Sequence, residues 1–417
     1  MAVETNGSSV PTKKLRCLII TTHYCPLVGG AQTVYDALAR CRPEQFHILT
    51  SRRDYLTGRV VDDYAAFDSK APYKITRLDR MRPDLEVGRS GALVRGLSTI
   101  RWWWLNRWLV GQIKAICLAE NIDAICISAS EAFMWLPAAL KRHMDQQIII
   151  FSHGEEISQV AHSRKAEKNR KTALNAADGI IAVSNYTANL LKENYGVPDD
   201  KIFLSTNGVD LEKFSGVVPE TKQAGLDFPA GPTVFSCGRL VRRKGFDNLI
   251  EAWPFVLEKI PDATLLIGGV GPMEEALKNR VKALNISENV RFLGNAKPAD
   301  MSAYFGLSTV FAMPNRTLSD GDTEGFGLVF LEASAMGTPS IAGRAGGTAD
   351  AVLEGKTGLR VDGNEISQIS EALLTLLTDD SLRNSMSQAA RKFAQSQGWS
   401  NKVASIIDFI ATTKSNH

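Results

Sequence analysis

The sequence lacks the cysteine spacings, long apolar runs and signal segments that mark metal-binding, membrane-spanning or secreted chains. No CxxC pair and no metal-ligand spacing occurs, so we expect free thiols in a reducing cytosol. The six cysteines are Cys17, Cys25, Cys41, Cys117, Cys126 and Cys237. No apolar run approaches the ~20 residues that cross a bilayer. The polar start predicts a disordered leader over residues 1–14 and no secretory signal.

Two further absences argue against particular classes of function. The formal net charge is only +3, which is too small to indicate a nucleic-acid partner. The dinucleotide fingerprint GxGxxG is absent from the first strand–helix unit, which disfavours a dehydrogenase. The chain has 417 residues, of which 44% are hydrophobic and 22% charged. These values are typical of a soluble protein with two or three domains.

Apolar runs alternate with helical patterns twice along the chain. Near-continuous runs such as residues 15–21 are typical of parallel strands that helices cover on both faces. We therefore predict an α/β protein with two Rossmann-like, doubly wound domains that face a cleft at their strand ends. The first domain covers residues 15–210 and the second covers 232–398, with a linker over 211–231. A final helix is predicted over 399–412.

The stretch from Asp322 to Ser340 gives the clearest indication of a site. Its two carboxylates, Glu324 and Glu332, stand eight positions apart, and the second lies within a run of helix formers, 328–336. If residues 326–329 form the first helical turn, their free N–H groups make an anion site that the helix dipole assists. Two carboxylates around a phosphate site suit a sugar nucleotide, which has hydroxyl-rich rings on both sides of its phosphates. Two glycines near the helix start, Gly325 and Gly327, allow a ligand to approach the backbone closely.

A basic turn follows a buried strand of the second domain. Arg239 and Lys244 stand five positions apart and could together hold a pyrophosphate, the arginine by paired bonds and the lysine as a point charge. Exposed surface charge is the alternative. The sequence Asp320-Gly-Asp322 resembles the DxD motif of metal-using sugar transferases. We interpret it as a solvated loop, because the cationic pair supplies the charge that a metal would bring, and we expect no metal site.

Two loops of the first domain are also candidates. Gly29 and Gly30 separate the first strand from a helix, where they form either a plain tight turn or a loop that lets a ligand approach. His153 follows the strand 147–152 and precedes Gly154, at the strand end where open α/β sheets bind ligands. A structural histidine is the alternative there.

Four tryptophans lie among arginines between Arg95 and Trp108. They are Trp102, Trp103, Trp104 and Trp108. Adjacent residues on a helix point about 100° apart, so three consecutive tryptophans cannot all face one core. Exposed aromatic rings among basic residues suit a membrane interface or a lipid-bearing acceptor. The alternative is an ordinary helix with one tryptophan at a domain contact.

The ordered set of motifs resembles the retaining glycosyltransferases of the two-Rossmann-domain type, GT-B, in family 4. The resemblance extends from Leu15 to Phe409, and within the family it is most similar to the bacterial phosphatidylinositol mannosyltransferases. The shared features are Gly29-Gly30, His153-Gly154, Asn207-Gly-Val-Asp210, Gly238-Arg239, Lys244-Gly245, and Glu324 with Glu332 in the E-x7-E pattern. Relatives often carry a glutamate where this chain has Asp350, so that residue has no assigned role.

The resemblance implies a role for each matched residue. Arg239 and Lys244 would hold the donor pyrophosphate, while Glu332 would bind the ribose and Glu324 the transferred sugar. Backbone N–H groups of Phe326, Gly327 and Leu328 would contact sugar or phosphate. His153 would contact the donor sugar near the reacting carbon, and Gly30 would let its loop approach the phosphate. Such enzymes use no metal or other cofactor, and their final helix crosses back onto the first domain.

The expected function is transfer of a hexose, of mannose or glucose type, from a GDP- or UDP-sugar to a lipid, lipid-linked or glycan acceptor, with retention of configuration. Two alternatives remain open: a nucleotide-sugar epimerase of the same fold, or a non-catalytic nucleotide-sugar-binding protein. The expected location is cytoplasmic, at the inner face of the membrane if the segment Trp102–Trp108 makes a peripheral contact there.

Overall fold

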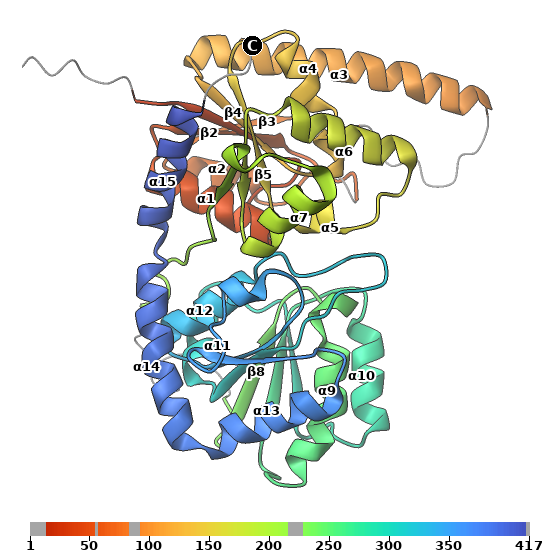
Figure 1. Ribbon diagram of the computed structural model, residues 1–417. Coiled ribbons are helices and arrows are strands. Elements are labelled where there is room, and N and C mark those ends of the chain that lie inside the picture. The colour runs from red at the N-terminus through yellow and green to blue at the C-terminus, as the bar shows by residue number, and fades with distance from the viewer. Residues whose placement is uncertain (1–13, 55–56, 83–91, 216–227, 414–417) are drawn as a thin grey trace, which may run out of the picture.

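The computed structural model describes residues 14–54, 57–82, 92–215 and 228–413, and within these the chain forms two α/β domains stacked one above the other (Figure 1). The side chains of residues 92–100 are not described. The predicted leader therefore lies outside the described residues except for Lys14, as does most of the predicted linker.

The first domain is built on a parallel sheet with strand order β3-β2-β1-β4-β5-β6-β7 in the described chain. Because the order reverses between β1 and β4, loops from both strands open onto one crevice at their carboxyl ends. The strands are β1 Cys17–Ile20, β2 Phe46–Ser51, β3 Lys74–Leu78, β4 Ala124–Ser128, β5 Gln147–Ser152, β6 Gly179–Ala182 and β7 Ile202–Leu204. The helices are α1 Gly30–Cys41, α2 Tyr64–Lys70, α3 Ala92–Glu120, α4 Leu136–Lys141, α5 Glu155–Ser158, α6 Arg164–Ala176 and α7 Asn185–Tyr195.

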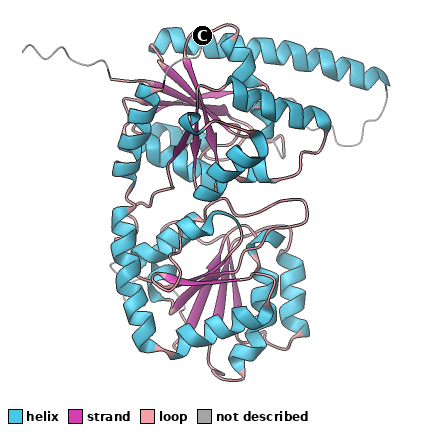
Figure 2. Cartoon of the chain, viewed as in Figure 1, coloured by secondary structure: helices cyan, strands magenta, loops and turns pink. Residues whose placement is uncertain are grey.

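The second domain repeats the same plan, with strand order β10-β9-β8-β11-β12-β13 and a reversal between β8 and β11. The strands are β8 Thr233–Cys237, β9 Thr264–Gly268, β10 Val290–Gly294, β11 Val310–Met313, β12 Ser340–Gly343 and β13 Gly358–Val361. The helices are α9 Phe246–Leu257, α10 Glu274–Ala283, α11 Met301–Leu307, α12 Leu328–Met336, α13 Ile366–Thr378, α14 Asp380–Ser396 and α15 Trp399–Thr412. Helices cover both faces of each sheet (Figure 2), as the near-continuously apolar strands require. The predicted fold class is confirmed.

The last two helices run along one side of both domains (Figure 1). Helix α14 packs on α12 of the second domain, whereas α15 packs on α1 of the first. The ring of Phe409 in α15 stacks on Phe203 of β7, with ring centroids 4.7 Å apart. The chain therefore crosses from one domain to the other between these helices, and α15, although it follows the second domain in the sequence, packs as part of the first.

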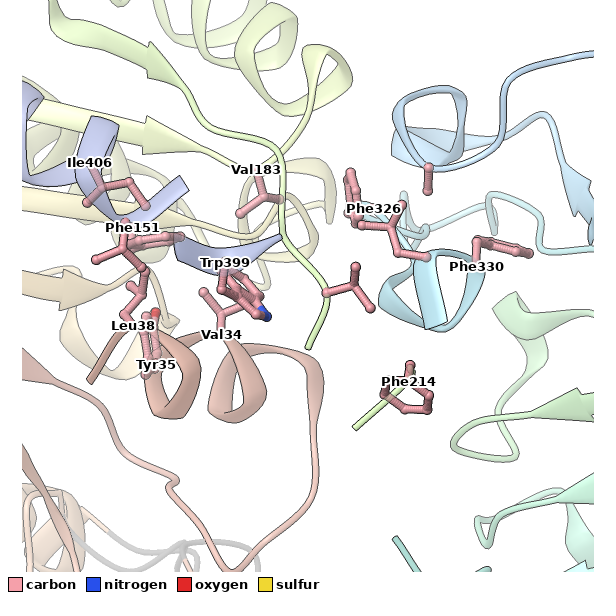
Figure 3. Close-up of a cluster of buried hydrophobic side chains, with 14 of the residues drawn as sticks. Val34, Tyr35, Leu38, Phe151, Val183, Phe214, Phe326, Phe330, Trp399 and Ile406 are labelled. Atoms are coloured by element: carbon pink, nitrogen blue, oxygen red, sulfur yellow. The ribbon is translucent and has the colours of Figure 1, made fainter. Parts of the chain in front are cut away.

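One apolar cluster extends through both domains. Figure 3 shows Trp399 of α15 beside Val34 of α1, with Phe326 and Phe330 farther along the same cluster. All four side chains are buried. Because burial of apolar surface stabilises by about 25 cal/mol per Å², this shared core favours the arrangement in which the domains touch.

Helix α3 is anchored by one face only. Leu109, Ile113 and Cys117 recur at helical spacing and are buried in a first-domain core cluster. The four tryptophans on its preceding turns are instead 38 to 64% exposed. These exposures do not fit one tryptophan at a domain contact, whereas the burial of Leu109, Ile113 and Cys117 fits the ordinary packed helix of the same alternative. In the described part of the chain, no helix combines the length and apolar character that crossing a membrane requires.

Candidate active site

The carboxyl ends of the two sheets face each other, and glycines let their loops meet. Gly325, in the loop between β11 and α12, lies against the turn that follows β5. A Cβ at Gly325 would clash with the carbonyl oxygen of His153, so only glycine permits this approach. The predicted loops after β5 and β11, although they belong to different domains, are therefore direct neighbours.

The cation–carboxylate pair at the centre of the site is Lys244 with Glu324. Nζ of Lys244 lies 2.5 Å from Oε2 of Glu324, and both side chains are largely buried. Burial alone would raise the pKa of Glu324, but the charges of Lys244 and Arg243 outweigh it and lower that pKa. Glu324 is thus ionised at neutral pH, as an acceptor of sugar hydroxyl bonds would be.

Arg239 lies on the same turn as Lys244. Gly238, its neighbour, has a φ of +147°, and a Cβ built there would stand 4.0 Å from Nζ of Lys244. The Arg239 side chain is exposed, and no described residue pairs with it by hydrogen bond or ion pair. A cation without a partner beside a second cation can accept an anionic ligand. The two residues predicted to hold a pyrophosphate, Arg239 and Lys244, thus lie on one turn.

Glu332 lies on the second turn of α12, which begins at Leu328 rather than at Phe326. The possibility that residues 326–329 form the first helical turn is therefore wrong, because Gly327, with a φ of +91°, caps the helix. Among the described residues none pairs with Glu332 by hydrogen bond or ion pair. Burial raises its pKa to about 7, and the charge of Lys213 opposes this only in part.

The predicted backbone donors surround this helix start. Phe326 is buried in the shared core, so its backbone position is set by packing. Gly30, at the start of α1, lies close to this point, since a Cβ there would stand 4.0 Å from Cδ1 of Leu328. Gly29 caps α1 in an extended conformation. The two glycine-bearing helix starts thus face each other across the domain boundary.

His153 is held by aromatic neighbours. Its Nε2 lies 2.7 Å from the hydroxyl of Tyr35, and its ring stacks on Phe151 with centroids 5.3 Å apart. Burial lowers the pKa of His153 to about 4, so the ring is neutral at pH 7. A neutral, fixed ring can accept or donate one hydrogen bond to a sugar but carries no charge.

Glu156 fixes the backbone of the His153 turn. Its Oε1 accepts bonds from Oγ of Ser152 at 2.6 Å and from the backbone N–H of His153 at 2.9 Å. Burial raises the pKa of Glu156 to about 7. The sequence interpretation missed Glu156 and Tyr35. The acidic residue three positions after the histidine was visible, but its inward direction was not.

We expected the Asp320-Gly-Asp322 loop to be solvated, but only part of it is. Asp320 is exposed, but Oδ1 of Asp322 accepts a bond of 3.1 Å from Nε of Arg243. In the part of the chain that the structure describes, no group of three or more metal-ligating side chains converges. Arg243 was not predicted as a site residue, although it directly precedes Lys244.

Asp350, which had no assigned role, joins the two domains. Its carboxylate accepts the backbone N–H of Asn185 at 2.7 Å and the side-chain amide of Asn185 at 2.6 Å. Asn185 is the first residue of α7, where N–H groups lack helical partners. The cap of α7 itself is Ser184, whose side chain accepts from the N–H of Thr187.

Two doubly wound domains with facing strand ends and an interdomain site constitute the GT-B architecture. A family model described as Glycosyltransferase Family 4 matches residues 28–213, and one described as Glycosyl transferases group 1 matches residues 218–393. The solved sucrose-phosphate synthase from Thermosynechococcus elongatus shares the fold with a TM-score of 0.74 and 21% identity, covering 95% of this chain and 98% of that one.

Two curated relatives are similar over nearly their full lengths. A GDP-mannose-dependent monoacylated alpha-(1-6)-phosphatidylinositol monomannoside mannosyltransferase of Corynebacterium glutamicum is 31% identical, covering 93% of this chain and 95% of the relative. A GDP-mannose-dependent alpha-(1-6)-phosphatidylinositol monomannoside mannosyltransferase of Mycolicibacterium smegmatis is 32% identical, covering 94% and 98%. The chain therefore belongs to the family 4 glycosyltransferases. It is a hexosyltransferase, and the comparisons give no support to the epimerase or the non-catalytic alternative.

Proposed function

We propose that this chain transfers mannose from GDP-mannose to a phosphatidylinositol-type lipid acceptor. The observation that carries the proposal is the identity of 31% and 32% to two GDP-mannose-dependent phosphatidylinositol monomannoside mannosyltransferases, over more than nine-tenths of the chain. The solved structures support the fold alone, so they do not choose the donor. The buried Lys244–Glu324 pair, beside Arg239, which pairs with no described residue, provides charges suited to a diphosphate joined to a sugar.

The donor would lie across the start of α12. Arg239 and Lys244 would bind the pyrophosphate, and Glu332 would accept bonds from the ribose hydroxyls. Glu324, which is ionised, would accept bonds from the hydroxyls of mannose. The N–H groups of Phe326, Gly327 and Leu328, at or just before the start of α12, would bind phosphate or sugar oxygens.

The chain's residues would favour loss of GDP from the anomeric carbon. The acceptor hydroxyl oxygen forms the new bond to that carbon, and the bond to the phosphate oxygen breaks. The proton of the acceptor hydroxyl passes to the departing phosphate. Attack and departure occur on the same face of the sugar, so the configuration at the anomeric carbon is retained. Positive charge from Arg239 and Lys244 stabilises the negative charge that develops on GDP. His153 stays neutral and positions the sugar from the first domain, and no metal is required.

The exposed tryptophans support a membrane contact for this proposal. Trp103 and Trp104 are 53% and 64% exposed, and the guanidinium of Arg107 lies 4.9 Å from the Trp103 ring centroid. Aromatic rings with adjacent cations partition to the interface of anionic membranes. We propose that the first half of α3 binds the membrane face that presents the lipid acceptor.

A donor screen tests the function directly. The purified chain is incubated with GDP-mannose, UDP-glucose or UDP-galactose, with or without vesicles that contain phosphatidylinositol or its monomannoside. We expect GDP release only when GDP-mannose and an inositol lipid are both present, with the new anomeric configuration read by NMR. UDP release, or transfer without an inositol lipid, would contradict the proposed substrates. Epimerised sugar nucleotide without acceptor would revive the isomerase alternative.

A further inference from the structure

Arg243 lies on the turn that is proposed to bind the donor, and its side chain contacts residues of both domains. Its Nε lies 3.1 Å from Oδ1 of Asp322, in the second domain, and its Nη2 lies 3.1 Å from Oε2 of Glu155, in the first. The Arg243 side chain is 15% exposed, so both bonds are shielded from water on one side. Arg243 thus spans the cleft from a position next to Lys244.

The segment that Arg243 reaches in the first domain is the His153 turn. Glu155 begins α5, two residues after His153. The same segment makes backbone contacts with the loop before α12: the N–H of Val160 donates to the carbonyl of Asp320 at 2.8 Å. A Cβ at Gly321 would clash with the carbonyl of Ser158. Arg243 is therefore the ionic part of a contact between the segments 153–160 and 320–325, which we call the closure contact.

The charges around Arg243 show why an arginine suits this place. Asp322 and Glu155 accept its bonds, and its charge also lowers the pKa of Glu324. Nη1 is buried and has no hydrogen-bond partner among the described residues. A lysine offers a single charged nitrogen and could not hold two carboxylates in the fixed geometry of a guanidinium.

We propose that Arg243 is a positioning residue of the transfer reaction. It seats the His153 turn of the first domain against the Glu324 loop of the second, so that both sides of the sugar site form together. This inference rests on the proposed function. Because Arg239 and Lys244 hold the pyrophosphate, loss of Arg243 weakens the closure contact and leaves affinity for GDP nearly unchanged. The expected signature is a lower kcat without a matching loss of GDP binding.

The test compares Arg243→Gln with Arg242→Gln. Arg242 is the adjacent exposed arginine, and no described residue pairs with its side chain, so the control removes the same charge from the same turn. We expect kcat of Arg243→Gln to fall at least about tenfold, because bonds between charged groups are lost, and the control to stay near wild type. GDP affinity, measured by calorimetry, should change less than about threefold in both.

Three further variants keep the test independent of folding. Glu155→Gln alters a side chain that is 52% exposed, and it should lower kcat in the same direction. The double variant Arg243→Gln with Glu155→Gln should lose less activity than the product of the single losses, because both changes remove one interaction. Arg243→Lys should restore only part of the rate.

Several results would overturn the inference. These are equal kcat in Arg243→Gln and Arg242→Gln, a loss of GDP affinity as large as the loss of kcat, or independent effects of Arg243→Gln and Glu155→Gln. Small-angle scattering of the full chain with saturating GDP separates this failure from failure of the proposed function. If the wild type transfers no mannose, the inference still requires a larger radius of gyration in Arg243→Gln than in Arg242→Gln.

Discussion

Lys244 and Glu324 meet at 2.5 Å although 80 residues separate them in the chain. This pair supports the first prediction. Lys244→Ala or Glu324→Ala should abolish measurable transfer while the far-UV circular dichroism stays unchanged, because each removes a group proposed to bind the donor. Lys278→Ala is the matched control, since Lys278 forms an exposed pair with Glu274 on α10. Such surface pairs contribute about 0–1 kcal/mol. Turnover near wild type in either site variant would refute the assignment.

Glu332→Gln should change how stability depends on pH. Burial raises the pKa of Glu332 to about 7 from an ordinary value of 4.5. Between these values the folded chain retains a proton that the unfolded chain releases, so stability falls as the pH rises. The contribution is complete below the ordinary value and is lost as pH passes about 7.

The urea midpoint without donor is the measurement for this prediction. From pH 4.5 to pH 7.5, wild type should lose stability relative to Glu332→Gln. The exposed Glu371 on α13 supplies the control variant Glu371→Gln, whose midpoint should follow wild type. If the gap between wild type and Glu332→Gln stays constant over this range, the assigned environment of Glu332 is incorrect.

Gly325→Ala should lower kcat in a folded protein. A Cβ at this position clashes with the carbonyl of His153, so the two domains would have to separate at that point. Gly111→Ala in α3 is a suitable control because no atom lies within 4 Å of its added Cβ, and Ala favours helices by about 1 kcal/mol over Gly. Steady-state kinetics and a thermal melt of both variants check this. Unchanged kcat in Gly325→Ala would mean that the contact is not needed in the reaction.

Asp350→Ala and Asn185→Ala should be coupled. The carboxylate of Asp350 accepts two bonds from Asn185 at the start of α7, and removal of such a cap costs about 0.5–2 kcal/mol. We expect each single variant to lower the free energy of unfolding by about 1 kcal/mol, and the double variant to be little worse than either. Denaturant titration of all four proteins checks this. Additive losses would show that the two residues act separately.

Trp103→Ala with Trp104→Ala should reduce binding to anionic vesicles. Both rings are exposed, and an interfacial tryptophan contributes apolar area that the membrane buries. Co-sedimentation with vesicles at low salt should show the bound fraction falling severalfold. Phe255→Ala is the control, since that ring is 49% exposed on α9 of the second domain. Equal binding by wild type and the double variant would exclude α3 as the membrane contact.

The sequence was sufficient to predict the fold and the meeting of loops from the two domains. Buried parallel strands produce apolar runs, and loops that follow such strands converge at one edge of a sheet. For this reason Lys244, Glu324 and His153 could be named as candidate site residues before their geometry was known. The helix over 328–336 was predicted with the same bounds because Gly337 ends it clearly.

The sequence pattern could not predict which residues pair when they lie far apart in the chain. Arg243 and Glu155 are 88 positions apart, and nothing in local periodicity selects one carboxylate from the many available. The same limit applies to Asp350 with Asn185 and to Tyr35 with His153.

The path of α15 has a consequence for synthesis on the ribosome. Helix α15 covers α1 and β7, and its Phe409 fills the space beside Gly179 of β6. When residues 14–215 have emerged from the ribosome, this apolar surface is still uncovered, because the covering helix is translated almost two hundred residues later. Synthesis of the first domain thus begins before that of the second and is completed after it, so nascent chains would need protection from aggregation during that interval.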